Sequence, residues 1–230
     1  MIMLCLLLLV NLYVTTSQIT LTGAQVLWKS ETSFGITSSP AQSEASGLVY
    51  YVSKGGWVTT VNVKTGEKSW HYNTKQGLLE TSTTSSPLLK GTSIFLGGAK
   101  ALDSVTGKPL WRRDLPGTQS SDVGSDSQGN QVYVGSARDD GTLYALNPAS
   151  GSIIWRTRLL GEKLSKPEVY EGLPGSSSTL VLICSLPSKT HQSFDPSVPL
   201  ARDGYIHAID ARNGRKMACA VGSLNPANIT

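Results

Sequence analysis

Residues 101–111 read Ala-Leu-Asp-Ser-Val-Thr-Gly-Lys-Pro-Leu-Trp, and related stretches recur along the chain. Each copy has an Asp or Asn four residues before a Gly, and three copies have a Trp four residues after that Gly. The copies span residues 61–70, 102–111, 146–155 and 209–218. Their shared residues are Asn62, Asp103, Asn147 and Asp210, followed by Gly66, Gly107, Gly151 and Gly214. Self-similarity of this kind is the signature of a repeat architecture, so it decides the fold class.

The tryptophans set the period of the repeat. Trp28, Trp70, Trp111 and Trp155 follow one another at intervals of 42, 41 and 44 residues. In the last copy Ala218 takes the place of the Trp, 63 residues after Trp155, which predicts an insertion in that unit. A period of about 40–45 residues is typical of a four-stranded propeller blade.

Each unit also has the strands and turns that a blade needs. Short runs rich in β-branched and aromatic residues, such as 49–52 and 132–134, predict strands. In the recurring turn we expect the Asp or Asn side chain to bond backbone N–H groups and the Gly to supply a positive φ. The prediction is an all-β fold, a β-propeller with about four four-stranded blades. The predicted blades span residues 32–72, 81–114, 119–159 and 164–221, within a repeat region of 25–221.

The repeated tryptophans are expected to be structural. A single four-stranded blade cannot bury both of its faces, whereas neighbouring blades stacked radially bury them. A Trp side chain has a large area to bury, so we expect each of the four to pack between two blades.

The motif in residues 101–111 resembles the PQQ repeat of quinoprotein-like β-propellers, including the tryptophan-docking pattern of that family. The resemblance covers about residues 25 to 220. The family includes quinoprotein dehydrogenases and the outer-membrane assembly lipoprotein BamB, so the resemblance implies a fold more specifically than a function.

The ring of blades is predicted to be incomplete. Residues 25–28 resemble the last strand of a blade whose other strands do not precede it, and the tail 222–230 is typical of a loop. An open array leaves blade faces and strand edges exposed. We therefore expect the chain to be part of a longer propeller, with self-association as the alternative way to close the ring.

The N-terminal 24 residues are predicted to be a signal peptide or an N-terminal anchor. Residues 3–10 form an apolar run that is too short to span a bilayer but fits the hydrophobic region of a secretory signal. No positive charge precedes the run, so an uncleaved anchor remains an alternative to a cleaved signal peptide. Apart from such an anchor we expect no transmembrane span. The expected location is extracytoplasmic: secreted, periplasmic or in the lumen of the secretory pathway.

Charge and cysteine content exclude several classes of protein. The net charge is +4, and Lys and Arg are scattered rather than gathered in a basic stripe, so we expect no nucleic-acid partner. The three cysteines form no C-x-x-C pair, which argues against a zinc ribbon. Cys184 and Cys219 are predicted on the second and fourth strands of one blade. A third strand would separate them, so no disulfide is expected between them.

One loop is a candidate recognition site. The insertion of the last unit, about residues 186–203, contains His191, Phe194 and Asp195. Propellers often recognise partners through long loops, although a solvated loop without function has the same appearance in sequence. No G-x-S-x-G motif is present, and the three histidines show no metal-ligand spacing, so no catalytic or metal-binding residue is predicted.

These observations favour a binding protein over an enzyme. The leading hypothesis is a non-catalytic propeller scaffold of the cell envelope or secretory pathway that contacts protein partners through blade edges and loops. One alternative is a fragment of a PQQ-dependent dehydrogenase, for which the resemblance would imply PQQ and calcium; no residue in the sequence supports either group. A second alternative is the luminal or extracellular domain of a sensor.

Overall fold

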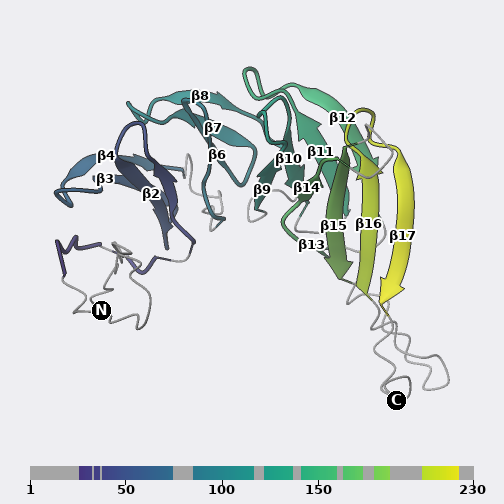
Figure 1. Cartoon of the computed structure of the whole chain (residues 1–230), viewed down its shortest axis with the longest axis horizontal. Helices are drawn as coiled ribbons and strands as arrows, with labels where there is room; N and C mark the ends of the chain where they lie inside the picture. The colour runs from purple at the N-terminus through teal and green to yellow at the C-terminus, as the bar shows by residue number, and fades with distance from the viewer. Residues whose placement is uncertain are drawn as a thin grey trace, which may run out of the picture.

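The structure is a computed structural model that describes residues 26–32, 34–36, 38–74, 85–116, 122–136, 141–159, 163–172, 179–186 and 204–222. Within these ranges every regular element is a β-strand. The strands form four antiparallel sheets, which follow one another along an open arch (Figure 1). The first and the fourth sheet form the two feet of this arch, and among the described residues no strand of one foot pairs with a strand of the other to close a ring. The predicted all-β fold with an unclosed ring of about four blades is therefore confirmed.

The first three sheets are simple meanders, in which each strand pairs with the next along the chain. The first sheet comprises β1 (Ala41–Ser43), β2 (Leu48–Ser53), β3 (Trp57–Asn62) and β4 (Lys68–Asn73). The second comprises β5 (Leu88–Lys90), β6 (Ser93–Leu96), β7 (Lys100–Asp103) and β8 (Pro109–Arg112). The third comprises β9 (Val123–Ser125), β10 (Val132–Gly135), β11 (Thr142–Leu146) and β12 (Ile153–Arg158).

The fourth sheet departs from the predicted four strands. Its first strand is split into β13 (Lys163–Leu164) and β14 (Glu168–Tyr170), and both pieces pair with β15 (Leu180–Leu186). The split falls at Pro167, which has no N–H to donate to a sheet ladder. β16 (Gly204–Asp210) and β17 (Lys216–Gly222) complete the sheet. Cys184 on β15 and Cys219 on β17 are free thiols with β16 between them, as their predicted strand positions require.

The recurring Asp or Asn shapes the turn between the third and fourth strands of each sheet. The side-chain Oδ1 of Asn62 accepts the backbone N–H groups of Lys64 (2.9 Å) and Thr65 (3.2 Å). Gly66 has a φ of +73° and donates its N–H to the carbonyl of Asn62 at 2.8 Å. A residue with a Cβ adopts this φ only with strain, which explains the glycine. The other three turns have the same Gly-to-Asx bond at 2.8–2.9 Å.

A serine two residues before a proline recurs near the start of three sheets, in residues 38–40, 85–87 and 165–167, and connects that part of the sheet to the second strand or the residue after it. In these three sheets the hydroxyl of this serine accepts a backbone N–H from the second strand or the residue that follows it. The pairs are Val52 to Ser38 (3.0 Å), Gly97 to Ser85 (2.7 Å) and Cys184 to Ser165 (3.0 Å). The sequence repeat of this serine therefore reflects a repeated hydrogen bond.

The hydrophobic core lies between the sheets rather than within them. Tyr50 and Val52 of the first sheet pack against Ile94 and Leu96 of the second. Two similar clusters join the second sheet to the third and the third to the fourth. Because strand side chains alternate between the two faces of a sheet, the middle sheets bury both faces. The two outermost faces, at the feet of the arch, have no further sheet against them in the described part of the chain.

Candidate interaction surfaces

Each repeated tryptophan joins its own sheet to the recurring turn of the next one. The indole Nε1–H donates to the backbone carbonyl of the residue that follows the recurring Asp or Asn. The four bonds are Trp28 to Val63 (2.7 Å), Trp70 to Ser104 (3.2 Å), Trp111 to Pro148 (2.7 Å) and Trp155 to Ala211 (2.8 Å). We call each such arrangement of indole, carbonyl and turn glycine a dock.

The glycine of each turn lies directly under the indole ring. A methyl group built on it would come within 2.5–2.7 Å of a ring carbon, closer than real Cβ atoms come to other atoms. The pairs are Gly66 under Trp28, Gly107 under Trp70, Gly151 under Trp111 and Gly214 under Trp155. Glycine is thus required in each dock for two reasons: its positive φ, and the space that the indole ring occupies where a Cβ would lie.

An aromatic side chain of the same sheet lies next to three of the indoles. Tyr50 lies 6.1 Å from Trp70, Phe95 lies 6.0 Å from Trp111, and Tyr133 lies 5.9 Å from Trp155, measured between ring centroids. These distances are in the range of tilted aromatic pairs. Each of these three indoles therefore contacts both an aromatic ring of its own sheet and the turn of the next sheet.

The structure brings the twelve predicted repeat residues together at these docks. Trp28 differs from the other three because Val26–Ser30 belongs to no sheet; the predicted last strand is absent from the described residues. A strand needs a hydrogen-bonded neighbour, and none of the described residues provides one. Trp28 nevertheless makes the same dock on the first sheet. The predicted recognition loop with His191, Phe194 and Asp195 lies outside the described residues.

Two of the recurring carboxylates have lowered pKa values. The pKa of Asp103 lies below its ordinary value because the hydroxyl and the backbone N–H of Thr106 both donate to the carboxylate. The pKa of Asp210 is lowered by the side chain of Arg212, which forms an ion pair with it at 3.2 Å, and by the Arg212 backbone N–H. Both carboxylates are therefore charged turn-forming groups, and neither has the raised pKa typical of a catalytic acid.

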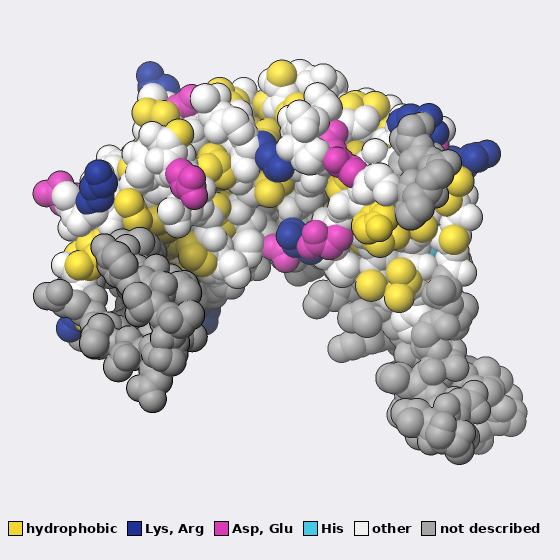
Figure 2. Space-filling view, viewed as in Figure 1, with side chains coloured by type: hydrophobic (Ala, Val, Ile, Leu, Met, Phe, Trp, Pro, Cys, Tyr) yellow, Lys and Arg dark blue, Asp and Glu magenta, His cyan; other side chains and the backbone are white. Residues whose placement is uncertain are grey.

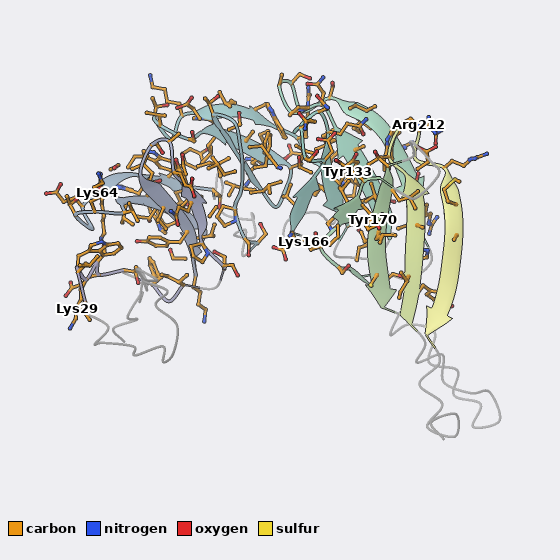
Figure 3. The ribbon with its side chains drawn as sticks, in the orientation of Figure 1. Lys29, Lys64, Tyr133, Lys166, Tyr170 and Arg212 are labelled. Carbon is orange, nitrogen blue, oxygen red and sulfur yellow. The ribbon has the colours of Figure 1, made fainter. Side chains whose placement is uncertain are left out.

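Polar side chains connect three sheets at the inner edge of the arch. The backbone N–H and the hydroxyl of Ser127 donate to the Glu171 carboxylate at 2.8 and 2.6 Å, and the Lys90 ammonium donates to the Ser127 carbonyl at 3.4 Å. The Ser127 bonds lower the pKa of Glu171. Lys166 pairs with Glu168 at 2.9 Å at the same edge, where basic and acidic side chains lie next to one another (Figures 2 and 3). No motif in the sequence indicated this connection, because it depends on loops of three different units.

The outer face of the first sheet contains a cavity, and we call this face the first end face. The apolar centre of this face consists of Val49, Tyr51 and Val61, and Trp28 and Ile36 pack against them. The cavity has a volume of about 320 Å³. It is lined by Thr32, Phe34, Tyr51, Ser53, Trp57, Thr59, Lys68 and His71. The Trp57 and His71 rings lie 5.4 Å apart within this lining, so the cavity has an aromatic wall and two basic side chains.

The outer face of the fourth sheet, which we call the last end face, is apolar. Val181, Ile183 and Ile209 of this sheet pack against the third sheet. The alternate residues of the same strands therefore point away from it. These residues are Leu182, Cys184, Ile206 and Ala208, together with Ala218, which pairs with Ala208. Ile206 is 53% exposed, so this face presents hydrophobic side chains to solvent.

The donor groups of the described residues do not fit the calcium ion of the dehydrogenase alternative. Over these ranges no three His, Cys, Asp or Glu side chains lie close enough together to hold a metal ion. The described part of the chain therefore offers no group of side chains to which a calcium ion can be assigned. No helix in that part is long and apolar enough to cross a membrane.

Comparison with known proteins identifies relatives of the chain. A family model described as outer membrane protein assembly factor BamB matches residues 11–101 and 97–217. BamB from Yersinia pestis is 34% identical over 119 residues, which are 46% of this chain and 30% of the relative. BamB from Escherichia coli strain K12 is 30% identical over 125 residues, which are 48% of this chain and 31% of the relative. The matched part spans about a third of the length of these relatives.

Solved structures share the fold. The crystal structure of BamB from Moraxella catarrhalis matches with a TM-score of 0.53 and 14% identity, over 86% of this chain and 68% of that one. A europium-containing methanol dehydrogenase matches with a TM-score of 0.60 and 14% identity, over 80% of this chain and 41% of that one. At these identities the likeness shows the fold alone. The predicted resemblance to PQQ-repeat propellers is confirmed.

Proposed function

The chain belongs to the family of the outer membrane protein assembly factor BamB, and on this premise we propose that it is a non-catalytic propeller scaffold of the cell envelope that binds other proteins. The relatives' name describes assembly of outer membrane proteins, a task that requires contact with protein segments. The likeness to methanol dehydrogenase concerns the fold alone and adds no support for an oxidoreductase.

The free edge of β17 carries this proposal. It is the outermost strand of the fourth sheet, so one side of its backbone has no partner strand among the described residues. Natural sheets protect such edges with charges or proline. β8 contains Pro109 and Arg112 and β12 contains Arg156 and Arg158, whereas β4 and β17 each contain a single lysine, Lys68 and Lys216, and β17 is the longest of these four strands.

An unprotected edge of seven residues suits an extended protein segment. Such a segment would add to the sheet as a further strand, with backbone hydrogen bonds for affinity and side-chain contacts for selectivity. We propose that β17 binds extended segments of partner proteins in this way. The two end faces are the further protein-binding surfaces of the open ring, and self-association through them is the more specific form of this proposal.

Peptide binding tests the role of β17. A fluorescent ten-residue peptide of alternating Val and Thr should bind the full chain and raise its fluorescence anisotropy. The same peptide N-methylated at every second amide cannot form the ladder bonds and should not bind. The variant Cys219→Lys, which charges the edge, should lose the interaction, whereas Val105→Lys, in an exposed turn of the second sheet, should keep it. Equal binding of both peptides would contradict the proposal.

A further inference from the structure

On the last end face one side chain is exposed whose counterparts in the other three sheets are buried. The residue four positions before the recurring Asp or Asn is Val58, Ala99, Leu143 and Ile206 in the four units. The first three are 0%, 1% and 0% exposed, because the next sheet covers them. Ile206 is 53% exposed. The fourth sheet therefore ends in a sheet-packing face like those that are covered three times within the chain.

The first end face presents the matching surface. Within the chain, the third sheet packs on residues of the fourth sheet that include Ile183 and Leu164, and Leu164 pairs with Ser185. Ile36 has the place of Leu164, because it bridges Ser53 at the same point of the second strand. Instead of a covering sheet, this face has the cavity of about 320 Å³ beside Phe34 and Trp57. Phe34 is half-exposed at its rim, so an apolar side chain entering the cavity would bury it further.

Trp28 and Ala218 are complementary at such a junction. At the three internal junctions the docking indole comes from the fourth strand of the preceding sheet. The fourth sheet cannot supply one, because Ala218 stands at the Trp position. The dock on the first sheet is already filled by Trp28 from its own chain. A preceding sheet that carried a Trp would compete for that place, whereas one that carries Ala leaves it free.

We propose that the last end face of one copy packs on the first end face of a second copy, and the reverse, so that two chains close one ring. Ile206 of one copy then enters the cavity beside Phe34 and Trp57 of the other. This inference rests on the proposed protein-binding function and names a second copy as the partner of the end faces. The junction continues the interface that already joins the sheets within the chain.

The shape of the molecule suits this partner. The four sheets follow an arch, with the first sheet at one foot and β15–β17 at the other (Figure 1). Lys29, the neighbour of Trp28, lies at the foot of the first sheet (Figure 3). Two arches set foot to foot give eight sheets, within the range of about four to eight blades of closed propellers. Head-to-tail contacts that close in this way make a ring rather than a filament.

The mass of the full chain in solution tests the proposal directly. Light scattering after size-exclusion chromatography should give twice the chain mass at micromolar concentration. Ile206→Lys should weaken dimerisation roughly tenfold or more, because it places a charge in the apolar junction. Val105→Lys changes a residue that is 58% exposed in a turn of the second sheet, and it should leave the dimer unchanged. Far-UV circular dichroism checks that both variants fold.

A pair of variants separates this junction from any other mode of association. Ala218→Trp introduces a second indole at the dock that Trp28 fills, and it should give a monomer. Trp28→Ala combined with Ala218→Trp should restore the dimer, since the indole then comes from the partner. A monomeric native chain, an open series of longer oligomers, or a double variant that stays monomeric would each overturn the inference. Peptide binding at β17 by a monomeric chain would leave the proposed function standing and refute this inference alone.

Discussion

The indole of Trp70 covers Gly107 so closely that a methyl group on the glycine would lie 2.6 Å from two ring carbons. The two residues belong to neighbouring sheets, and the indole N–H bonds a carbonyl three residues before the glycine. This pairing explains why Trp and Gly recur together in the sequence. The backbone of Gly107 is the point where the indole of the preceding sheet contacts the turn of the next one.

Gly107→Ala should destabilise the fold by more than about 1 kcal/mol, since the alanine is strained at a φ of +70° and also displaces the indole. Gly91→Ala is the matched control, because Gly91 has a φ of +55° but nothing within 4 Å of an added methyl group. Urea unfolding followed by circular dichroism measures both. A loss for Gly107→Ala no larger than that for Gly91→Ala would show that the indole does not rest on the glycine.

Trp111→Ala should lower the free energy of unfolding by about 3–5 kcal/mol, as truncation of a large core side chain does. Trp111→Phe keeps a ring against Phe95 but removes the N–H that bonds Pro148, and it should cost about 1 kcal/mol. The same unfolding experiment compares the two variants. A near-neutral Trp111→Ala would contradict the packing of this side chain between the second and third sheets.

The pH dependence of stability should decrease when Asp103 is replaced by Asn. The folded pKa of Asp103 lies below the ordinary value of 3.8. Its carboxylate therefore contributes stability that is complete above that value and is lost as pH falls through the folded pKa. Asn147 shows that an amide oxygen accepts the same backbone bonds at 2.9 and 3.1 Å.

Thermal unfolding between pH 7 and pH 2 measures this effect. The difference in stability between the native chain and Asp103→Asn should shrink as pH falls below 3.8. The converse variant, Asn147→Asp, should gain a pH-dependent contribution of the same sign. A constant difference across the whole range would show that the carboxylate charge has no part in holding the turn.

Ser85→Ala should destabilise the second sheet by about 1–3 kcal/mol, because it leaves the N–H of Gly97 without its acceptor in a buried place. Ser152→Ala, in an exposed turn, is the control and should be near neutral. Hydrogen exchange monitored by NMR gives a local measurement. Exchange of the Gly97 amide that is as slow in Ser85→Ala as in the native chain would contradict the role of this hydroxyl.

The sequence predicted the parts of the fold that repeat. An Asp or Asn and a Gly recur in every unit, as at Asn62 and Gly66, because each turn has the same Gly-to-Asx hydrogen bond. Together with the period of the tryptophans, this spacing predicted the four sheets. The indole docks were expected only as packing between blades. Their bond to the carbonyl after the Asp or Asn depends on the angle between sheets, which no single unit specifies.

Surfaces that depend on the ends of the array were not predictable in the same way. The cavity beside Phe34 and Trp57 exists because the described residues place no sheet against the first one. The contact of Ser127 with Glu171 joins loops 44 residues apart and follows no repeated motif. In both cases the decisive contacts come from the arrangement of whole sheets.

The Hα chemical shifts of the four turn glycines test the arrangement of the sheets most directly. One Hα of each of Gly66, Gly107, Gly151 and Gly214 points into the face of an indole, in the direction where a Cβ would meet the ring. Ring currents should move these four protons far upfield in the NMR spectrum, while the protons of Gly91, with no ring nearby, should keep ordinary shifts. Four upfield glycines would establish sheets joined in series by tryptophan docks, and ordinary shifts at all four would contradict that arrangement.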